Sequence, residues 1–153
     1  MTQWSAGRIE KYATQAAAVG EIPEAVLRID ALQLEVPVYA GTGEWNLNRG
    51  AGRLEGSAPF DAVGNTVLAA HRDGYFRRLR NLQVGDRLQV QTLQGTFGYV
   101  VTDIRIVAPT ATEVLAPTAQ RTLTLVTCYP FFFLGPAPQR YIVRAELEAA
   151  PPV

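Results

Sequence analysis

A single cysteine and a single histidine are the residues of this chain best suited to covalent chemistry. Cys128 ends the apolar run TLTLVTC just before a Tyr-Pro turn, and His71 ends the run NTVLAAH just before the polar turn RDG. Both therefore fall where a strand meets a loop, a place where reactive side chains are commonly held. They stand 128 − 71 = 57 positions apart. Only folding can bring the thiol and the imidazole together, as cysteine–histidine catalysis requires.

Arg140 is the third candidate, and it opens the last apolar run, RYIVRAEL, 140 − 128 = 12 positions after Cys128. Two strands joined by a turn-rich loop of this length have their adjoining ends at the same end of a sheet. Alternation places Arg140 and Ile142 on one face of the run and Tyr141 on the other. A guanidinium beside a thiol can favour the thiolate form and can donate hydrogen bonds to an oxyanion.

Each of these residues also has an interpretation that involves no chemistry. A lone cysteine is most often a small buried apolar side chain, a lone histidine more often packs or is solvated than catalyses, and an arginine is usually a surface charge. Chemistry is favoured here because two unique residues both end apolar runs and an arginine opens the next run. Spacing alone does not decide between the two interpretations.

Composition indicates one globular domain. The 153 residues are 48% hydrophobic and 18% charged, which is typical of a chain that buries a core. Fourteen basic and fourteen acidic residues cancel, so no charge excess points to nucleic acid or to an anionic membrane surface. One cysteine and one histidine exclude an intrachain disulfide, a multi-cysteine metal site and a histidine-rich metal site. We therefore expect no metal, no cofactor and no nucleic-acid partner.

Hydrophobic alternation predicts a mainly β fold. Strands are expected at residues 26–29, 34–39, 65–71, 122–128 and 140–147, and residues 87–107 are expected to form a hairpin that turns at LQG. In the run that ends at Cys128, alternate residues point to opposite faces. Seven or eight short strands with little helix between them favour a sandwich or a barrel over repeated βαβ units.

Helical segments are expected to be few and short. One is predicted over residues 2–19, and a turn or two over FRRLRNL with its apolar side chains inward. Thr110 and Glu113 match a capping box that starts a short helix at TEVL. The segment GTGEWNLNRGAG is predicted as a loop with at most one helical turn, and Pro37 indicates a strand edge or a bulge.

Four motifs in order resemble the sortase family, and most closely its class D. TLTLVTC is similar to the family's TLxTC signature, and CYPFFFLGPAPQRY follows from it. VLAAHRDGYFRRLRNLQVGD is similar to the family's histidine segment, and LEVPVYAGTGEWNLNRGAG resembles the strand and short helix that open its fold. The resemblance runs from about Val26 to Leu147. It departs from the family pattern at Ala70, where glycine is usual.

The resemblance implies a closed eight-stranded β-barrel with a few short helices and an N-terminal helix. It implies a catalytic domain over residues 25–148, a helical extension at 1–24 and a frayed tail at 149–153. It also implies an extracytoplasmic protein of the cell envelope, anchored in its native form by an N-terminal transmembrane helix that is absent from this chain. The sequence itself has no run of eighteen apolar residues and no signal-peptide pattern at its start.

For the site, the resemblance implies a Cys–His–Arg arrangement carried onto Cys128, His71 and Arg140. Backbone N–H groups beside the cysteine, at Thr127 and Tyr129, are expected to support the oxyanion. The implied substrate is a secreted protein with a C-terminal LPxT-type sorting signal. The enzyme would cut after the threonine and pass the acyl group to an amine of a cell-wall precursor or a pilin lysine.

The loop FFFLGPAP is the candidate wall of a substrate groove. Three consecutive phenylalanines would be unfavourable if fully exposed, so they either pack under the loop or line an apolar groove. We expect Phe133 and Leu134, together with Ala70, to line that groove.

Two other classes of function remain open at this point. A cysteine hydrolase or an L,D-transpeptidase also uses cysteine and histidine on a β-rich scaffold, and the order His71, Cys128, Arg140 favours the sortase interpretation over both. A β-barrel binding module that retains the motif residues without turnover is the alternative outside the enzymes.

Overall fold

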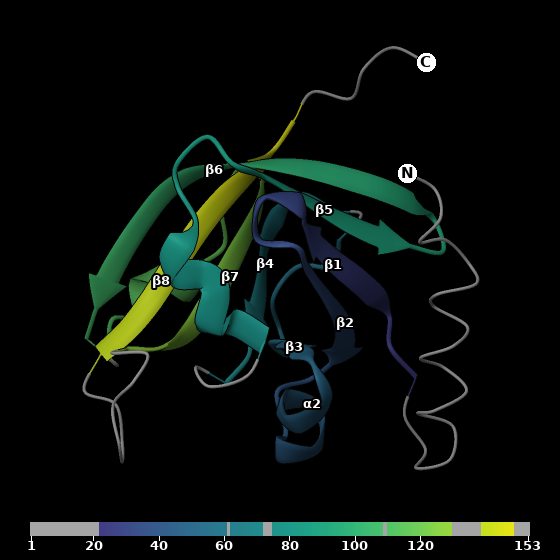
Figure 1. Ribbon diagram of the computed structural model, residues 1–153, viewed down its shortest axis with the longest axis horizontal. Coiled ribbons are helices and arrows are strands. Elements are labelled where there is room, and N and C mark those ends of the chain that lie inside the picture. The colour runs from purple at the N-terminus through teal and green to yellow at the C-terminus, as the bar shows by residue number, and fades with distance from the viewer. Residues whose placement is uncertain (1–21, 61, 72–74, 109, 130–138, 149–153) are drawn as a thin grey trace.

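A closed barrel of eight strands is the framework formed by the described residues of the computed structural model (Figure 1). Those residues are 22–60, 62–71, 75–108, 110–129 and 139–148, and residues 44, 45, 48, 75, 128 and 129 are described by their backbone only. The strand order around the barrel is β1-β2-β3-β4-β7-β8-β6-β5. The predicted mainly β fold with an eight-stranded barrel is confirmed. The helix predicted over 2–19 and the tail at 149–153 lie outside the described residues.

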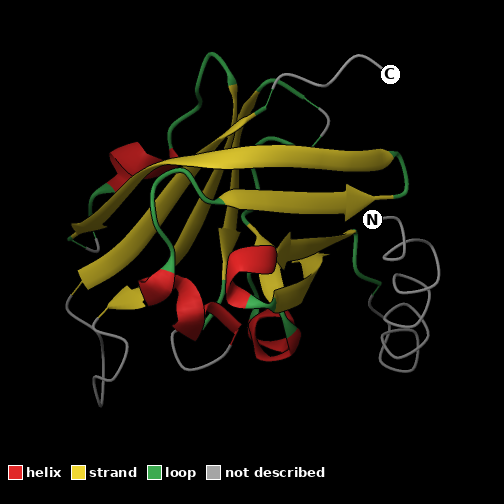
Figure 2. Cartoon of the chain, turned by 45° about the horizontal axis from the view of Figure 1, so that its top comes forward, coloured by secondary structure: helices red, strands yellow, loops and turns green. Residues whose placement is uncertain are grey.

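The strands follow the predicted alternating runs closely, and the short helices lie at the periphery of the strands (Figure 2). The strands are β1 (Ala25–Ile29), β2 (Leu34–Ala40), β3 (Ala51–Arg53), β4 (Gly64–Ala69), β5 (Arg87–Thr92), β6 (Gly95–Val107), β7 (Arg121–Tyr129) and β8 (Gln139–Leu147). The helical segments are η2 (Asp30–Leu32), α2 (Glu44–Arg49), η3 (Tyr75–Asn81) and η4 (Thr112–Leu115). Among the described residues no helix is both long and apolar enough to cross a membrane.

Alternation along each strand divides the barrel wall into an inner and an outer face. The inner face of β7 and β8 carries Leu123, Leu125, Val143 and Ala145, each fully buried in one core cluster with residues of the other strands. Burying such a side chain contributes about 1.5–3 kcal/mol, so this row strongly fixes which residues face outward. The intervening residues of the same strands, such as Val126, therefore lie on the outer face.

The segment η3 closes over the barrel as a 3-10 helix directly downstream of the histidine motif. Phe76 and Leu79 are both fully buried in the core cluster, so the predicted inward packing of this segment is confirmed. Gly85 follows with a φ of 98°, a left-handed backbone that glycine adopts without steric cost. This turn sends the chain into β5 at the predicted place.

Two local predictions are wrong and a third, on Pro37, agrees with the strand register. The segment after β2 holds α2, a helix of six residues, which exceeds the single turn of 3.6 residues that was expected. The N-cap of η4 is Ala111, with no side-chain cap hydrogen bond, so Thr110 does not form a capping box. Pro37 pairs with Val26 on β1 at a point where β2 has not yet paired with β3, so it lies at a local edge of the sheet, as predicted. It is tolerated there because the parallel ladder to β3 begins only one residue later, and its missing N–H is not needed.

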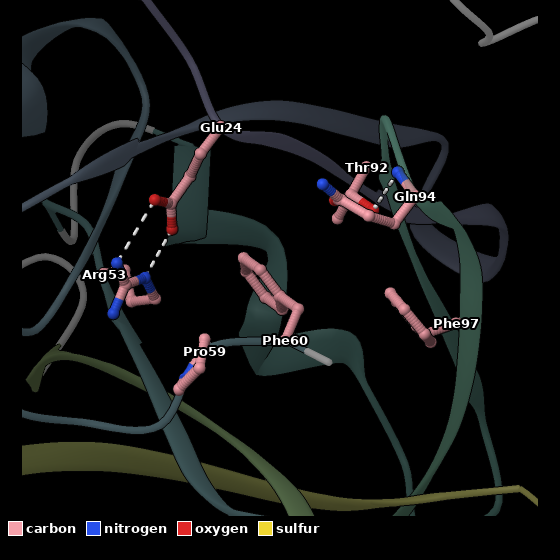
Figure 3. Close-up of a pocket in the computed structure, with 7 residues that line it drawn as sticks. All are labelled: Glu24, Arg53, Pro59, Phe60, Thr92, Gln94 and Phe97. Carbon is pink, nitrogen blue, oxygen red and sulfur yellow. Dashed lines mark hydrogen bonds and ion pairs between the residues drawn. The ribbon is translucent and has the colours of Figure 1, made fainter. Parts of the chain in front are cut away.

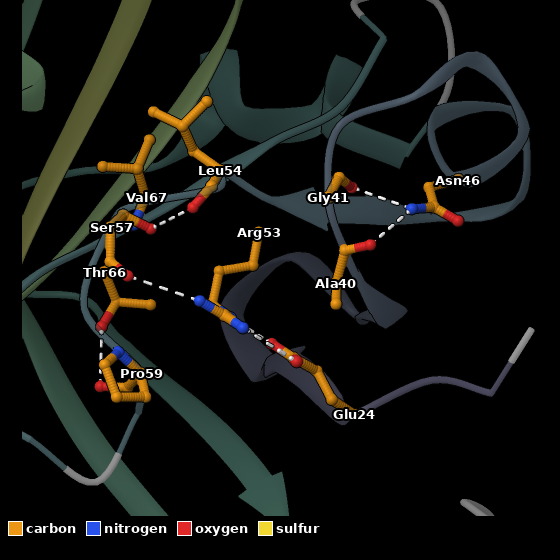
Figure 4. Close-up of polar contacts among 10 residues, drawn as sticks. All are labelled: Glu24, Ala40, Gly41, Asn46, Arg53, Leu54, Ser57, Pro59, Thr66 and Val67. Carbon is orange, nitrogen blue, oxygen red and sulfur yellow. Dashed lines mark hydrogen bonds and ion pairs between the residues drawn. The ribbon is translucent and has the colours of Figure 1, made fainter.

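Arg53, at the end of β3, connects the start of β1 to the loop that precedes β4. Its guanidinium forms a two-point ion pair with Glu24 and also donates to the Ser57 carbonyl at 3.4 Å (Figure 4). The Ser57 hydroxyl donates to the Leu54 carbonyl at 2.7 Å and accepts from the Val67 N–H at 3.2 Å. These contacts fix the loop from which β4 starts, and hence the path of β4.

The Tyr99 phenol on β6 is buried beside an arginine side chain. Burial raises the pKa of the Tyr99 phenol, and the nearby Arg121 guanidinium, to which it is hydrogen-bonded, partly offsets that rise. Arg121 also stacks over the Phe97 ring at 4.7 Å from its centroid and donates to the Phe60 carbonyl. This cluster lies at the end of the barrel where β7 begins, away from Cys128.

Candidate functional site

The backbone pairing of β7 with β8 sets Cys128 directly opposite Arg140. These two residues are partners in the antiparallel register, one step beyond Thr127 and Tyr141. Cα atoms of such partners lie about 4.5–5.5 Å apart. Arg140 is partly buried, and its Nη1 donates to the Gln139 carbonyl at 2.9 Å. The structure describes the backbone of Cys128 but not its side chain.

The pairing of β4 with β7 leads His71 to the same end of the sheet. These strands are parallel, with Ala69 opposite Val126. The ladder continues past the end of β4, because the Ala70 N–H donates to the Val126 carbonyl at 3.3 Å. Extending that register by one further residue pair brings His71 level with Cys128. His71 is partly exposed.

His71, Cys128 and Arg140 therefore form one row across three neighbouring strands, which we call the reactive row. Strands in a sheet are about 4.8 Å apart, so the outer two Cα atoms of this row are separated by about 10 Å. Alternation along the strands assigns all three positions to the outer face of the barrel. Two residues away along each strand, Ala69, Val126 and Ile142 form the next row on the same face. The pairing of β4 with β7 thus brings together the ends of the two runs that carry His71 and Cys128, 57 positions apart in the sequence.

Thr127 ties the cysteine segment to the histidine segment from the inner face. It is 2% exposed, and its hydroxyl donates to the Ala70 carbonyl at 2.9 Å. Thr127 precedes Cys128 and Ala70 precedes His71, so this bond joins the two residues immediately before the proposed reacting groups. Such a buried hydrogen bond fixes the alignment of the ends of β4 and β7 more tightly than the backbone ladder alone.

Replacing Thr127 with valine is expected to lower the free energy of unfolding by about 1–3 kcal/mol, because the buried Ala70 carbonyl loses its hydroxyl donor. Valine keeps the shape of the side chain, so the change isolates the hydrogen bond. Denaturant unfolding measures the effect. Thr102→Val is the matched control, since Thr102 is exposed on β6 and should change stability by less than about 0.5 kcal/mol. Equal losses of stability in the two variants would show that the hydrogen bond from Thr127 to Ala70 does not stabilise the two strand ends.

A second polar cluster holds η4 against the outer face below the reactive row. The Asn65 amide donates to the Val114 and Ala116 carbonyls at 2.9 and 3.1 Å and accepts from the Thr124 hydroxyl at 2.5 Å. Arg144 also donates to the Val114 carbonyl, at 2.8 Å. Asn65 is 2% exposed with both ends of its amide bonded. Sequence reasoning missed this role, although an asparagine opening an apolar run is a signal for a buried polar contact.

Between η4 and the reactive row, the outer face presents an apolar strip. Ala69 and Val126 are partly exposed there, and Ile142 is the third residue of the same row. The predicted groove residue Ala70 lies elsewhere: it is 6% exposed and packs in the core cluster. That prediction is wrong because neighbouring residues of a strand face opposite sides, so the outward residue is Ala69. Phe133 and Leu134 lie outside the described residues, as does the side chain of Tyr129.

Two of the hollows formed by described residues lie at the opposite end of these strands. One, of about 190 Å³, has Phe60 and Phe97 on its walls, the Glu24–Arg53 ion pair on one side and Thr92 with Gln94 on the other (Figure 3). Another, of about 360 Å³, lies between the loop before β4 and the segment after η4. Phe60 precedes the start of β4, whereas His71 follows its end. These hollows are therefore separate from the reactive row.

Comparison with known proteins places this barrel in a family. A model of the sortase domain matches residues 27–148. The chain is 36% identical over 122 residues to Sortase D of Bacillus subtilis (strain 168), covering 79% of this chain and 62% of that protein. It is 28% identical over 131 residues to Sortase A of Streptococcus agalactiae serotype III (strain NEM316), covering 80% of this chain and 51% of that protein. The chain thus spans less than two thirds of the length of these relatives.

Solved structures show the same fold. A Clostridium perfringens Sortase D5 transpeptidase superposes with a TM-score of 0.76 at 27% identity, covering 92% of this chain and 88% of that one. Streptococcus agalactiae Sortase C1 superposes with a TM-score of 0.77 at 31% identity, covering 86% and 70%. The sortase domain model extends from β1 to the end of β8, and these structures share the arrangement of the barrel. The chain belongs to the sortase family and is most like its class D.

Proposed function

We propose that this chain is a cysteine transpeptidase that cleaves an LPxT-type sorting signal after the threonine and transfers the acyl group to an amine. The observation that carries the proposal is the reactive row, in which the backbone register sets Cys128 beside Arg140 and brings His71 level with both. Membership of the sortase family supports the same reaction. We further propose residues 25–148 as the catalytic domain, a proposal supported by the barrel strands, which run from Ala25 to Leu147, and by the family match over residues 27–148.

In the first half of the reaction, the Cys128 thiolate forms a bond to the threonine carbonyl carbon, and the carbonyl oxygen takes the negative charge. An ordinary thiol is mostly protonated at neutral pH, so cationic neighbours such as Arg140 raise the reactive fraction. Arg140 and the backbone N–H groups at Thr127 and Tyr129 are the proposed donors to the oxyanion. As the tetrahedral intermediate collapses, the C–N bond breaks and the departing amine takes a proton from the His71 imidazolium.

In the second half, an acceptor amine attacks the thioester that now joins the acyl group to Cys128. The amine loses a proton to the neutral His71 imidazole, the C–S bond breaks, and the thiolate is restored. Histidine suits both steps because its ordinary acidity lies close to neutral pH. Transfer to an amine rather than to water requires that water be poorly placed at the thioester. The apolar strip of Ala69 and Val126 beside the reactive row serves that exclusion and supports the bound peptide.

We place the enzyme at the cell envelope, with secreted proteins that carry C-terminal sorting signals as substrates. The acceptor is an amine of a cell-wall precursor or of a pilin lysine. Both proposals rest on family membership and on the chemistry of the reactive row, since each acceptor offers the primary amine that the second half-reaction consumes.

Incubating the protein with LPxT-type peptides and a primary amine is expected to give a product in which the amine replaces the residues after the threonine. Mass spectrometry identifies it directly. A thiol-blocking reagent provides the control, because Cys128 is the only cysteine and its modification should stop the reaction. A hydrolysed peptide without amine transfer would instead establish a cysteine hydrolase. Absence of any product over a library of such peptides would favour a binding module.

A further inference from the structure

Ala70 and Leu79, which lie on either side of His71 in the sequence, both accept hydrogen bonds from hydroxyl groups on the inner face of the barrel. Upstream, the Thr127 hydroxyl donates to the Ala70 carbonyl at 2.9 Å. Downstream, the Tyr141 hydroxyl donates to the carbonyl of Leu79, within η3, at 3.2 Å. Thr127 and Tyr141 are 2% and 8% exposed, so both bonds form away from water. Figure 1 shows η3, in teal, in front of β7 and β8.

The two hydroxyl donors belong to one cross-strand pair. Thr127 and Tyr141 are partners in the register of β7 with β8, directly beside the pair formed by Cys128 and Arg140. The inner-face pair therefore donates to Ala70 and Leu79, while the adjacent pair supplies the thiol and the guanidinium of the proposed site. A rigid connection follows between the end of η3 and the strands that bear the other two groups.

Tyr141 is not needed simply to satisfy the Leu79 carbonyl. That carbonyl also accepts a hydrogen bond from the Leu82 N–H at 3.0 Å, within the turn that ends η3. Loss of the phenol hydroxyl therefore leaves the acceptor bonded, and the cost to folding is small. What the hydroxyl adds is a link from η3 to β8, whose first residues include Arg140.

We propose that Tyr141 is a positioning residue that, through its hydrogen bond to Leu79, sets the placement of the His71 imidazole relative to Cys128 and Arg140. The catalytic role of His71 rests on the proposed function. The effect of Tyr141 on the position of the His71 imidazole does not depend on it. Small changes in the position of a catalytic group matter, since a displacement of about 1 Å can cost on the order of a hundredfold in rate. A residue that acts only through packing would not alter the imidazole when its hydroxyl alone is removed.

The test compares Tyr141→Phe with Tyr99→Phe by NMR of the imidazole and by peptide turnover. His71 is the only histidine, so a spectrum of the imidazole C–H groups reports on it without ambiguity. Tyr99 is a matched control, because it is 1% exposed and its hydroxyl is hydrogen-bonded to Arg121. Tyr99 pairs with Leu147, six residues along β8 from Tyr141 and hence about 20 Å away.

For Tyr141→Phe we expect the His71 signals to shift or broaden and kcat to fall about tenfold, with KM for the peptide unchanged. For Tyr99→Phe we expect both readouts to match the unsubstituted protein. Unchanged His71 signals in Tyr141→Phe, or the same change in both variants, would overturn the proposal. If the unsubstituted protein turned over no peptide, the proposed function would fail, and the NMR comparison would still decide the role of Tyr141. Failure of Tyr141→Phe to fold would also overturn the proposal, because it would make the hydroxyl a requirement of the fold rather than of the imidazole placement.

Discussion

Replacing Cys128 with alanine is expected to abolish peptide turnover, with a loss on the order of 10⁴-fold or more. The thiolate is the atom that bonds to the substrate in the proposed reaction, and the chain contains no second cysteine to replace it. Without it, the remaining groups of the reactive row have no covalent intermediate to stabilise. Turnover is measured from amine-extended product by chromatography and mass spectrometry.

The fold should survive this substitution, because it removes one sulfur atom near the end of β7 while the ladders to β4 and β8 involve the backbone. A thermal melt that superposes on that of the unsubstituted protein provides the control. Cys128→Ser serves as a second variant, since a hydroxyl has the shape of the thiol but is a much weaker nucleophile without further activation. Product formation by folded Cys128→Ala at more than a few per cent of the normal rate would rule out the thiol as nucleophile.

Replacing Arg140 with alanine is expected to lower kcat/KM by about two to three orders of magnitude, corresponding to about 3–4 kcal/mol of transition-state stabilisation. The guanidinium is proposed to donate to the oxyanion, a group that exists only in and around the transition state. The loss should therefore appear mainly in kcat, with the KM for the peptide little changed. Initial rates over a range of peptide concentrations separate the two constants.

Two further arginine variants sharpen this prediction. Arg140→Lys keeps the charge but loses the planar fork of donors, so an intermediate rate is expected. Arg105→Ala is the matched control: Arg105 lies on β6, two residues from the Val107 that pairs with Arg140, and its side chain is 57% exposed and paired with Asp103. It removes a nearby positive charge without touching the reactive row and should leave turnover within about twofold. Near-normal turnover by Arg140→Ala would show that the oxyanion is stabilised by other groups.

Much of this site was readable from the sequence because the relevant signal is local. Cys128 and Arg140 are joined by a short loop between two strands, and alternation along each run states which residues share a face. Those rules place the cysteine and the arginine at one end of a sheet, and the register observed between β7 and β8 agrees. Short strands at regular spacing favoured a sandwich or a barrel, and only the resemblance in four motifs implied a closed barrel of eight strands.

The placement of His71 was not readable in the same way. It depends on the parallel pairing of β4 with β7, which joins residues 57 positions apart such as Asn65 and Thr122. The alternation of apolar residues in β4 or in β7 does not indicate which strand will lie beside it. That choice depends on long-range pairing around the closed barrel. The resemblance to a family supplied what alternation could not.

The local errors have physical causes as well. The helix α2 forms in a segment rich in glycine and asparagine, where local preference is weak, and Asn46 on that helix donates to the Ala40 and Gly41 carbonyls at the end of β2. Tertiary contacts of this kind override propensity. The Ala70 error came from assigning a residue beside the histidine to the wrong face, which a shift of one position along a strand is enough to cause.

The proposed reaction requires a covalent bond between the substrate acyl group and Cys128. Intact-protein mass spectrometry after mixing with an LPxT-type peptide, quenched in acid without added amine, tests for it. We expect a mass increase equal to that of the free peptide fragment that ends at threonine less one water, located on Cys128 by digestion and lost when an amine is added before the quench. Release of the same fragment with no adduct at Cys128, or an adduct that persists in Cys128→Ala, would contradict the proposed mechanism.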